Sequence, residues 1–376
     1  MLRVLRSYGE KAMQKRFSLV SQYVALVFVA LAISVPALAQ TYTYSTVYDF
    51  QNNGTDPANP NSLIIDSGGN LYGTSMSGGS HGNGAVFELT PNGGLTVLYN
   101  FIYPDALPNS LTRDSRQGNL YGTTLGFDTA GTVFELVKGS GGTYTLSTLY
   151  NEKNSRPLSV TLDAQGNLYG TDDGDCLCVF EIPAGGHWNN IYSYGVNPVE
   201  PQGNVLISPS GNVYFSIDDE ENGGLGWVTE LNVTVFGIPG GYSPDWLVQD
   251  SAGNIYGLAT IMEDAPDATG LIFKIDTSGN VSTIFGFPGG AGGKQPSGPF
   301  ALDSAGNIYG TVSGGKYGAG VVFKVTPQRQ ETVLHTFTDE GYHVGLVMDA
   351  AGNLYGTSTS GGSAGLGYVW KLTVSN

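Results

Sequence analysis

The chain has 376 residues and is rich in glycine and poor in charge, with 56 Gly, 18 Pro and 13% charged residues. Its net charge of −16 and its 16 basic residues argue against nucleic acid as a partner, because phosphate backbones are bound by clustered Lys and Arg. Glycine and proline at this level would indicate disorder in a chain without a period, but here they recur at fixed places.

Residues 1–39 have the features of a secretory signal peptide. Lys11, Lys15 and Arg16 precede an apolar stretch over residues 23–35, and the segment 37–39 (Ala-Leu-Ala) supplies a small-residue cleavage site. Its removal takes away five basic residues and one acidic residue, so the formal charge moves from −16 to −20. An uncleaved membrane anchor is the alternative, which the polar residues within 17–39 disfavour. We therefore expect a mature chain, residues 40–376, that is secreted or periplasmic and keeps no stable membrane span.

After the leader, the motif Gly-Asn-(Leu/Val/Ile)-Tyr occurs seven times, at spacings of 42 to 53 residues. Its asparagines are Asn70, Asn119, Asn167, Asn212, Asn254, Asn307 and Asn353. A repeat of this length, built from short β-rich segments separated by glycine, is typical of a propeller in which each repeat is one blade. No linker interrupts the repeats, so we expect residues 40–376 to form a single domain.

Each repeat begins with a strand that ends in an acidic turn. In the first repeat, residues 63–65 lead into Asp66 and then Gly69-Asn70; the same Asp position recurs six times, with Ser208 as its one replacement. Asp accepts hydrogen bonds from amides a few residues on, and Gly-Asn supplies the positive φ values of a tight turn. These carboxylates are predicted to cap turns. A proline precedes each such strand, except that His343 takes its place in the last repeat.

Three more strands follow in each repeat, at residues 71–74, 86–89 and 96–101 of the first. The third is apolar on both faces, which suits a sheet packed between neighbours; in the fourth repeat we place it at residues 228–231. Residues 46–50 resemble a fourth strand, whereas the last repeat ends after its third. The predicted fold is an all-β, seven-bladed β-propeller of four-stranded antiparallel blades, closed by the N-terminal strand joining the last blade.

The combined motifs D-x-x-G-N-(L/V/I)-Y-G-T, G-x-V-F-(E/K)-L-T and T-V-L-Y-x-F resemble the GloVer tandem repeats of exported bacterial proteins named for their choice of C-terminal anchor. The resemblance covers nearly the whole mature chain. It implies a propeller-like fold and export, and it brings no biochemical activity with it. The fourth repeat departs most, with Ser208 for Asp, Phe215 for Gly and Thr229 for Phe.

The loops between second and third strands differ among the repeats. Those of the first, sixth and seventh are rich in Gly and Ser, whereas those of the third to fifth are acidic. The acidic residues are Asp172, Asp173, Asp175, Asp218, Asp219, Glu220, Glu221, Glu263, Asp264 and Asp267. They would lie on one sector of one face, where they could hold Ca²⁺ or attract a basic partner. The alternative is a solvated acidic rim, because no loop has the spacing of a known calcium motif. No other cofactor is expected.

Catalytic patterns are sparse, so we assign no catalytic residue and favour a protein that is not an enzyme. The four histidines show no paired spacing, although His81 and His343 fall in loops where a general base is conceivable. His335 replaces a strand tyrosine and is expected to pack. Cys176 and Cys178 are either a local tether or free thiols.

A few aromatic residues fall in predicted loops, where they would suit sugar stacking. They are Tyr103, Phe127, Trp188, Tyr242, Trp246 and Tyr317. The function we predict is that of an exported monomeric binding or scaffolding propeller whose long loops take a glycan, an extracellular protein or a cation. The alternative is a secreted lyase or hydrolase with its site at the central opening.

Overall fold

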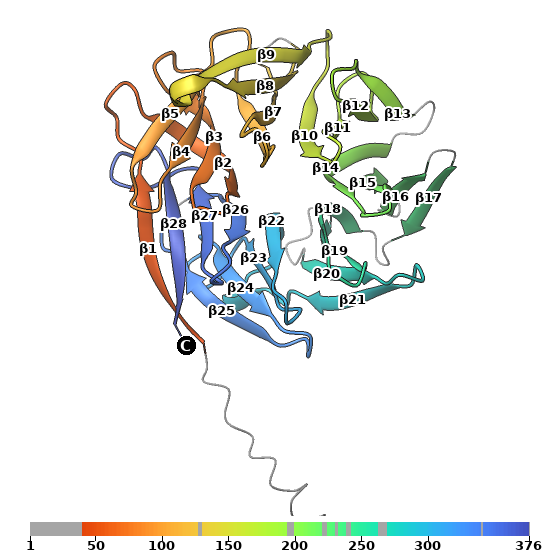
Figure 1. Ribbon diagram of the computed structural model, residues 1–376. Coiled ribbons are helices and arrows are strands. Elements are labelled where there is room, and N and C mark those ends of the chain that lie inside the picture. The colour runs from red at the N-terminus through yellow and green to blue at the C-terminus, as the bar shows by residue number, and fades with distance from the viewer. Residues whose placement is uncertain are drawn as a thin grey trace, which may run out of the picture. The chain divides into compact units, whose positions relative to one another are not determined.

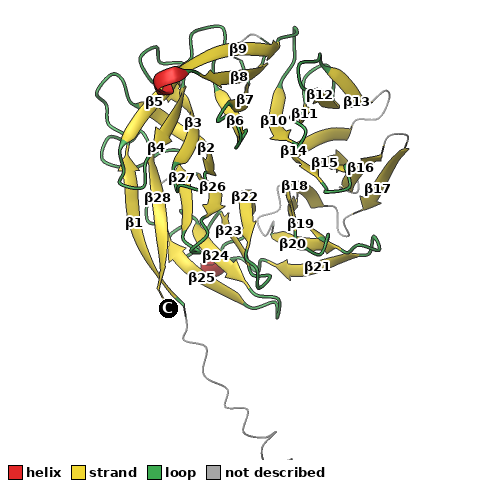
Figure 2. Ribbon diagram, in the orientation of Figure 1, coloured by secondary structure: helices red, strands yellow, loops and turns green. Residues whose placement is uncertain are grey.

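A computed structural model describes residues 40–126, 130–193, 199–219, 224–229, 232–237, 242–261, 269–339 and 341–375. The chain divides into two units. The compact unit Tyr42–Val374 contains nearly all of the strand residues, and the other, Met1–Thr41 with Ser375–Asn376, lies almost wholly outside the described residues. The predicted leader, residues 1–39, is therefore not described. Figure 2 shows that the compact unit is built from strands.

The described residues form seven four-stranded sheets, labelled in Figure 1. The first three sheets are β2(Pro57–Ile65), β3(Leu71–Gly78), β4(Ala85–Leu89), β5(Leu95–Asn100); β6(Pro108–Arg113), β7(Leu120–Thr124), β8(Thr132–Lys138), β9(Tyr144–Tyr150); and β10(Pro157–Leu162), β11(Leu168–Asp172), β12(Cys178–Ile182), β13(Asn189–Ser193). The next three are β14(Val199–Ile207), β15(Val213–Asp219), β16(Gly224–Thr229), β17(Asn232–Gly237); β18(Tyr242–Gln249), β19(Ile255–Ile261), β20(Gly270–Ile275), β21(Val281–Gly286); and β22(Pro296–Leu302), β23(Ile308–Val312), β24(Val321–Val325), β25(Glu331–Thr336). The seventh is ordered β1(Thr41–Asp49), β28(Tyr368–Ser375), β27(Leu354–Ser358), β26(His343–Met348).

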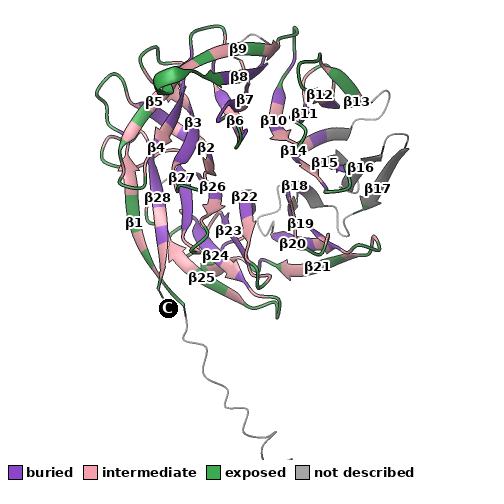
Figure 3. Cartoon of the chain, viewed as in Figure 1, coloured by how far each residue is buried: buried purple, intermediate pink, exposed green. Residues whose placement is uncertain are grey.

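Within the compact unit, the first strands of the sheets lie innermost and the fourth strands outermost (Figure 1). Each first strand contacts the next along the chain, from β2 to β26, and β26 contacts β2. The core lies between neighbouring sheets: Tyr72 and Val86 of the first sheet pack with Leu111 and Phe134 of the second. Figure 3 shows the buried residues concentrated on the inner strands. The fold is an all-β propeller with four-stranded antiparallel blades.

The acidic turns cap the first strands as the sequence indicated. Asp66 Oδ1 accepts the amides of Gly68 and Asn70, both at 2.9 Å, and Asn70 Nδ2 donates to Asp66 Oδ2 at 3.1 Å. The same bonds form at Asp163, Asp250, Asp303 and Asp349. Ser208 Oγ accepts the amide of Asn212 at 3.0 Å in the fourth sheet. These repeated groups are structural, because their lone pairs are already used within the turns.

A small residue of the second strand pairs with a large residue of the third strand. Gly73 pairs with Phe87, and a Cβ added to that glycine would lie 2.4 Å from the ring, so only glycine fits beside it. In the fourth sheet Phe215 pairs instead with Gly226, and Val213 pairs with Val228. The third strand is therefore Gly224–Thr229, and the predicted placement at residues 228–231 is wrong by three residues. The reason is an exchange of Gly and Phe between the paired strands.

Candidate binding face

Strand direction alternates within each sheet, so the loops between second and third strands share one face with the links between sheets. We call this the long-loop face. Among the described residues, six large apolar side chains are strongly exposed, and four of them lie here: Ile102, Tyr103, Tyr317 and Tyr342, at 57, 62, 58 and 80% exposure. Large apolar side chains exposed on one face make that face a candidate binding surface.

The Gly/Ser-rich loops of the first, sixth and seventh sheets have one common structure. In each loop, the amide of a glycine before the third strand donates to the carbonyl of the glycine six residues earlier. The pairs are Gly84 to Gly78 at 3.2 Å, Gly320 to Gly314 at 2.8 Å and Gly367 to Gly361 at 3.1 Å. The carbonyls of Gly84, Gly320 and Gly367 each accept an amide from the end of the fourth strand of the same sheet. These loops are internally bonded and hold a defined shape.

Two of the exposed tyrosines lie on backbone held by such bonds. The carbonyl of Tyr342 accepts the amide of Thr359 at 3.0 Å, and the amide of Tyr342 donates to Thr359 Oγ1 at 3.3 Å. Tyr317 lies within the sixth-sheet loop, where Lys316 Nζ sits 5.1 Å from its ring centroid. Both rings are therefore presented to solvent from ordered segments.

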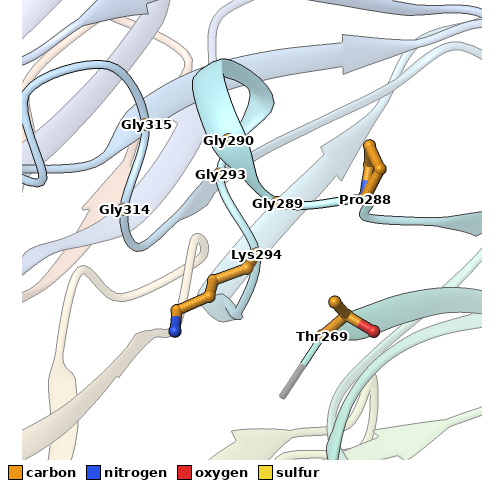
Figure 4. Close-up of a pocket in the computed structure, with 8 residues that line it drawn as sticks. All are labelled: Thr269, Pro288, Gly289, Gly290, Gly293, Lys294, Gly314 and Gly315. Carbon is orange, nitrogen blue, oxygen red and sulfur yellow. The ribbon is translucent and has the colours of Figure 1, made fainter. Parts of the chain in front are cut away.

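A pocket of about 450 Å³ opens where the fifth and sixth sheets meet (Figure 4). It is lined by Thr269 before β20, Pro288, Gly289, Gly290, Gly293 and Lys294 of the link to β22, and Gly314 and Gly315 of the next loop. A Cβ on Gly289 or Gly290 would meet no atom within 4 Å, so bare backbone borders open space there. Lys294 is the charged residue of this lining.

The position of Lys294 is fixed by both neighbouring sheets. Its amide donates to the carbonyl of Ser313 at 3.0 Å, and its carbonyl accepts the amide of Gly270 at 2.7 Å. The side chain is half-buried. Among the described residues it takes part in neither of the ion pairs, which join Arg116 to Asp114 and Arg156 to Asp173. The backbone of Lys294 is thus fixed at the pocket, and the residue is part of the pocket lining.

The three acidic residues of the third-sheet loop are engaged locally. Asp172 is fully buried and accepts hydrogen bonds from Ser155 Oγ at 2.5 Å, from the amide of Arg156 at 3.1 Å and from the amide of Gly174 at 2.8 Å. Asp173 pairs with Arg156 at 3.4 Å. Asp175 accepts from Asn154 Nδ2 at 2.8 Å. These carboxylates fasten the loop to the preceding link.

The rest of the predicted acidic sector is not described at side-chain level. Asp218 and Asp219 end β15, and nothing is described of their side chains; Glu220, Glu221, Glu263, Asp264 and Asp267 lie outside the described residues. Within the described ranges, no three His, Cys, Asp or Glu residues are grouped so that they could hold a metal ion. The calcium site therefore stays a prediction.

The histidines are not brought together with the acidic loop. His81 and His187 are exposed, and His335 stacks on Tyr44 with ring centroids 4.0 Å apart. His343 is only 6% exposed and stacks on Phe337, and neither ring nitrogen has a hydrogen-bond partner. Burial lowers the pKa of His343 to about 4; the charge of Asp339 and its nearby backbone oppose this shift, and His335 adds to it. The imidazole is therefore neutral at pH 7.

Asp245, which sequence patterns did not single out, lies on the innermost strand β18. Its Oδ1 is 2.8 Å from where a Cβ of Gly203 would be, and the carboxylate accepts the amide of Gly298. The side chain is part-exposed yet closely surrounded by protein. Burial raises the pKa of Asp245 to about 6. Its two neighbours come from the adjoining sheets, so no local motif marks the position.

The remaining predicted loop aromatics have other environments. Trp188 stacks on Tyr150 and on Phe180, with centroids 3.6 and 3.9 Å apart, and Trp246 packs on the core between the fifth and sixth sheets. Tyr242 begins β18 and nothing is described of its side chain, and Phe127 lies outside the described residues. Of the four predicted loop aromatics whose side chains are described, Tyr103 and Tyr317 are strongly exposed, while Tyr342 was missed. Cys176 and Cys178 form a disulfide.

This fold and face define the class: a β-propeller whose first, sixth and seventh sheets carry internally hydrogen-bonded loops on one face. Residues 36–229 and 229–376 each match the Gloeobacter/Verrucomicrobia repeat, and the chain belongs to that family. No curated protein matches its sequence. Within the described ranges, no helix has the length and apolar character needed to cross a membrane.

Several solved propellers have a similar fold. Virginiamycin B lyase from Staphylococcus aureus aligns with a TM-score of 0.65 at 16% identity, covering 89% of this chain and 99% of that one. A periplasmic gluconolactonase from Pseudomonas aeruginosa gives 0.54 at 16% identity, over 76% and 87% of the two chains. A puromycin hydrolase gives 0.55 at 11% identity, over 82% and 52%. At such identities the likeness is one of fold.

Proposed function

We propose that the protein is an exported, non-enzymatic propeller that binds a carbohydrate on its long-loop face. The observation that carries this proposal is that Tyr103, Tyr317 and Tyr342 all lie on that face, each more than half exposed. A tyrosine ring offers an apolar face to the C–H groups of a sugar and a hydroxyl for hydrogen bonding, at a small cost in side-chain entropy.

The setting of these rings supports binding. The backbone segments of Tyr317 and Tyr342 are held by hydrogen bonds, so little order has to be imposed there when a ligand arrives. The neighbouring loops present Ser, Asn and glycine backbone groups, which suit the hydroxyls of a sugar.

The architecture we propose is a closed ring of seven blades, monomeric and scaffold-like. The seven sheets, the contact of β26 with β2 and the place of β1 beside β28 support it. Residues 1–39 carry the pattern of a secretory leader, so we place the mature chain in the periplasm or outside the cell.

Calorimetry with cellohexaose, xylohexaose and chitohexaose tests the proposal. We expect at least one to bind, and Tyr317→Ala and Tyr342→Ala each to weaken that binding about tenfold or more, since exposed aromatics are frequent hot spots. Val137→Ala removes exposed apolar surface from strand β8 and serves as the control. Equal affinity in the tyrosine variants and the control would count against the long-loop face.

The acidic residues of the third to fifth repeats carry a separate proposal, a Ca²⁺ site that would assist the same face. Titration of Ca²⁺ into the metal-stripped mature chain is compared with a variant in which Asp218, Asp219, Glu220 and Glu221 are Asn or Gln. Saturable binding that disappears in the variant supports the site; unchanged heats indicate a solvated rim.

A second candidate function is a secreted lyase or hydrolase acting at the ring axis. Asp245 favours it, since a carboxyl with a pKa of about 6 can exchange protons near neutral pH. Solved propellers of similar fold include a lyase and a hydrolase. Turnover of lactone, ester or cyclic depsipeptide substrates that falls at least a hundredfold in Asp245→Asn would favour the enzyme; absence of turnover across the panel would favour binding.

A further inference from the structure

We propose that the pocket around Lys294 is a subsite for a carboxylate-bearing sugar, a uronic acid. This rests on the proposed carbohydrate-binding function and names the chemical class of ligand. The pocket volume of about 450 Å³ falls within the range of small-molecule sites and admits a single sugar unit.

The charge of the lining selects the ligand. Lys294 is its charged residue, and the rest is backbone of five glycines with Pro288 and Thr269. Lys294 as a residue is half-buried, and a positive charge beside protein attracts an anion more strongly than one in bulk water, because the surrounding dielectric is lower. The peptide groups of Gly289 and Gly290 and the Thr269 hydroxyl supply hydrogen-bonding partners for sugar hydroxyls.

The pocket shares a loop with one of the exposed tyrosines, Tyr317. Gly314 and Gly315 form one wall, and the same loop carries Tyr317 two residues further on, with a turn closed by the amide of Gly318 on the carbonyl of Gly315 at 3.2 Å. Lys294 is fastened to Ser313, which directly precedes this wall. An oligosaccharide lying across Tyr317 could therefore place an acidic unit in the pocket.

The test compares two ligands with one skeleton, trigalacturonate and its fully methyl-esterified form, by calorimetry at low salt. We expect the acid to bind about tenfold more tightly than the ester, as a charge-assisted hydrogen bond would give. Lys294→Met should abolish this preference and Lys294→Arg should retain most of it. The control Lys153→Met removes the same charge from an exposed position in another link and should change neither affinity by more than about twofold.

The outcomes separate the two proposals. If acid and ester bind equally and the tyrosine variants weaken both, the carbohydrate-binding face stands and the uronate subsite is wrong. If neither form binds, the uronate subsite is wrong whatever other sugar binds. A titration with acetate identifies the source of the carboxylate: Lys294-dependent binding of acetate as tight as that of trigalacturonate overturns the sugar assignment. Equal thermal midpoints for Lys294→Met and the wild type confirm that the variant is folded.

Discussion

Replacing His343 with proline is expected to stabilise the protein and remove part of its sensitivity to acid. His343 pairs with Ser358 at the end of β27, as Pro296 pairs with Val312 at the end of β23. The carbonyl of Tyr342 accepts the amide of Thr359, as the carbonyl of Gln295 accepts the amide of Ser313. The amide at position 343 belongs to the same peptide group as the Tyr342 carbonyl and points the opposite way, away from the second strand. Proline therefore fits this position without losing a ladder hydrogen bond.

The magnitude follows from the buried ring. Both nitrogens of His343 lack partners, and burying an unsatisfied polar group costs about 1–3 kcal/mol, so His343→Pro should gain about 1–2 kcal/mol at pH 7. Between pH 6.5 and about 4 the imidazole is protonated in the unfolded chain but stays neutral in the folded protein, so wild-type stability falls as pH falls through this window. At 1.36 kcal/mol per pKa unit, the extra loss between pH 7 and pH 5 is about 2 kcal/mol.

Urea unfolding of wild type and His343→Pro at pH 7 and pH 5 measures both effects. Comparing the two proteins cancels the contributions of the other histidines, and a His81→Asn variant, changed at an exposed position, should follow the wild type. The variant should be the more stable at both pH values, with a larger advantage at pH 5. Parallel pH dependences, or a variant less stable at pH 7, would refute the reasoning.

Three further predictions concern the scaffold. Gly257→Ala should cost about 2–4 kcal/mol of unfolding free energy, because its Cβ would lie 2.1 Å from the Phe273 ring; Gly286→Ala, with no atom within 4 Å, is the control in the same denaturation assay. Asp303→Ala should cost about 1–2 kcal/mol at pH 7. Partial burial opposes ionisation there, but hydrogen bonds lower the pKa overall, so the difference should shrink as pH falls below the ordinary Asp range; a cost independent of pH would contradict this. Asp245→Asn should be more stable than wild type by about 3 kcal/mol at pH 7, because burial raises the pKa of the carboxyl from 3.8 to about 6. Between pH 3.8 and about 6 the folded carboxyl keeps a proton that the unfolded chain releases, so wild-type stability falls as pH rises. Thermal melts at pH 4 and pH 7 measure the difference in midpoint between Asp245→Asn and wild type; an equal difference at both pH values would contradict this prediction.

Much of the fold was predictable because its determinants are local. Asp66 and Asn70 are four residues apart, and the hydrogen bonds between them lie within one turn, so the turn can be predicted from the local sequence. The same logic failed where a determinant spans two strands. Phe215 and Gly226 exchange the usual order of large and small residues, so a motif read along the chain placed the third strand three residues late.

The candidate site was less predictable because it depends on contacts between sheets. Trp188 falls in a loop by sequence, yet it stacks on Tyr150 and Phe180. The pocket at Lys294 is lined by three segments from two sheets, and no residue spacing in the sequence predicts that these segments lie together. Tyr342 could have been noticed from its place beside His343, where a link residue precedes the one repeat that lacks proline.

The measurement that tests the binding face most directly is hydroxyl-radical footprinting of the mature chain with and without a bound oligosaccharide. The long-loop face predicts protection of Tyr103, Tyr317 and Tyr342, while Val137 and Val333 on outer strands keep their reactivity. Protection confined to Val137 and Val333, or tyrosine reactivity unchanged at saturating ligand, would contradict the account.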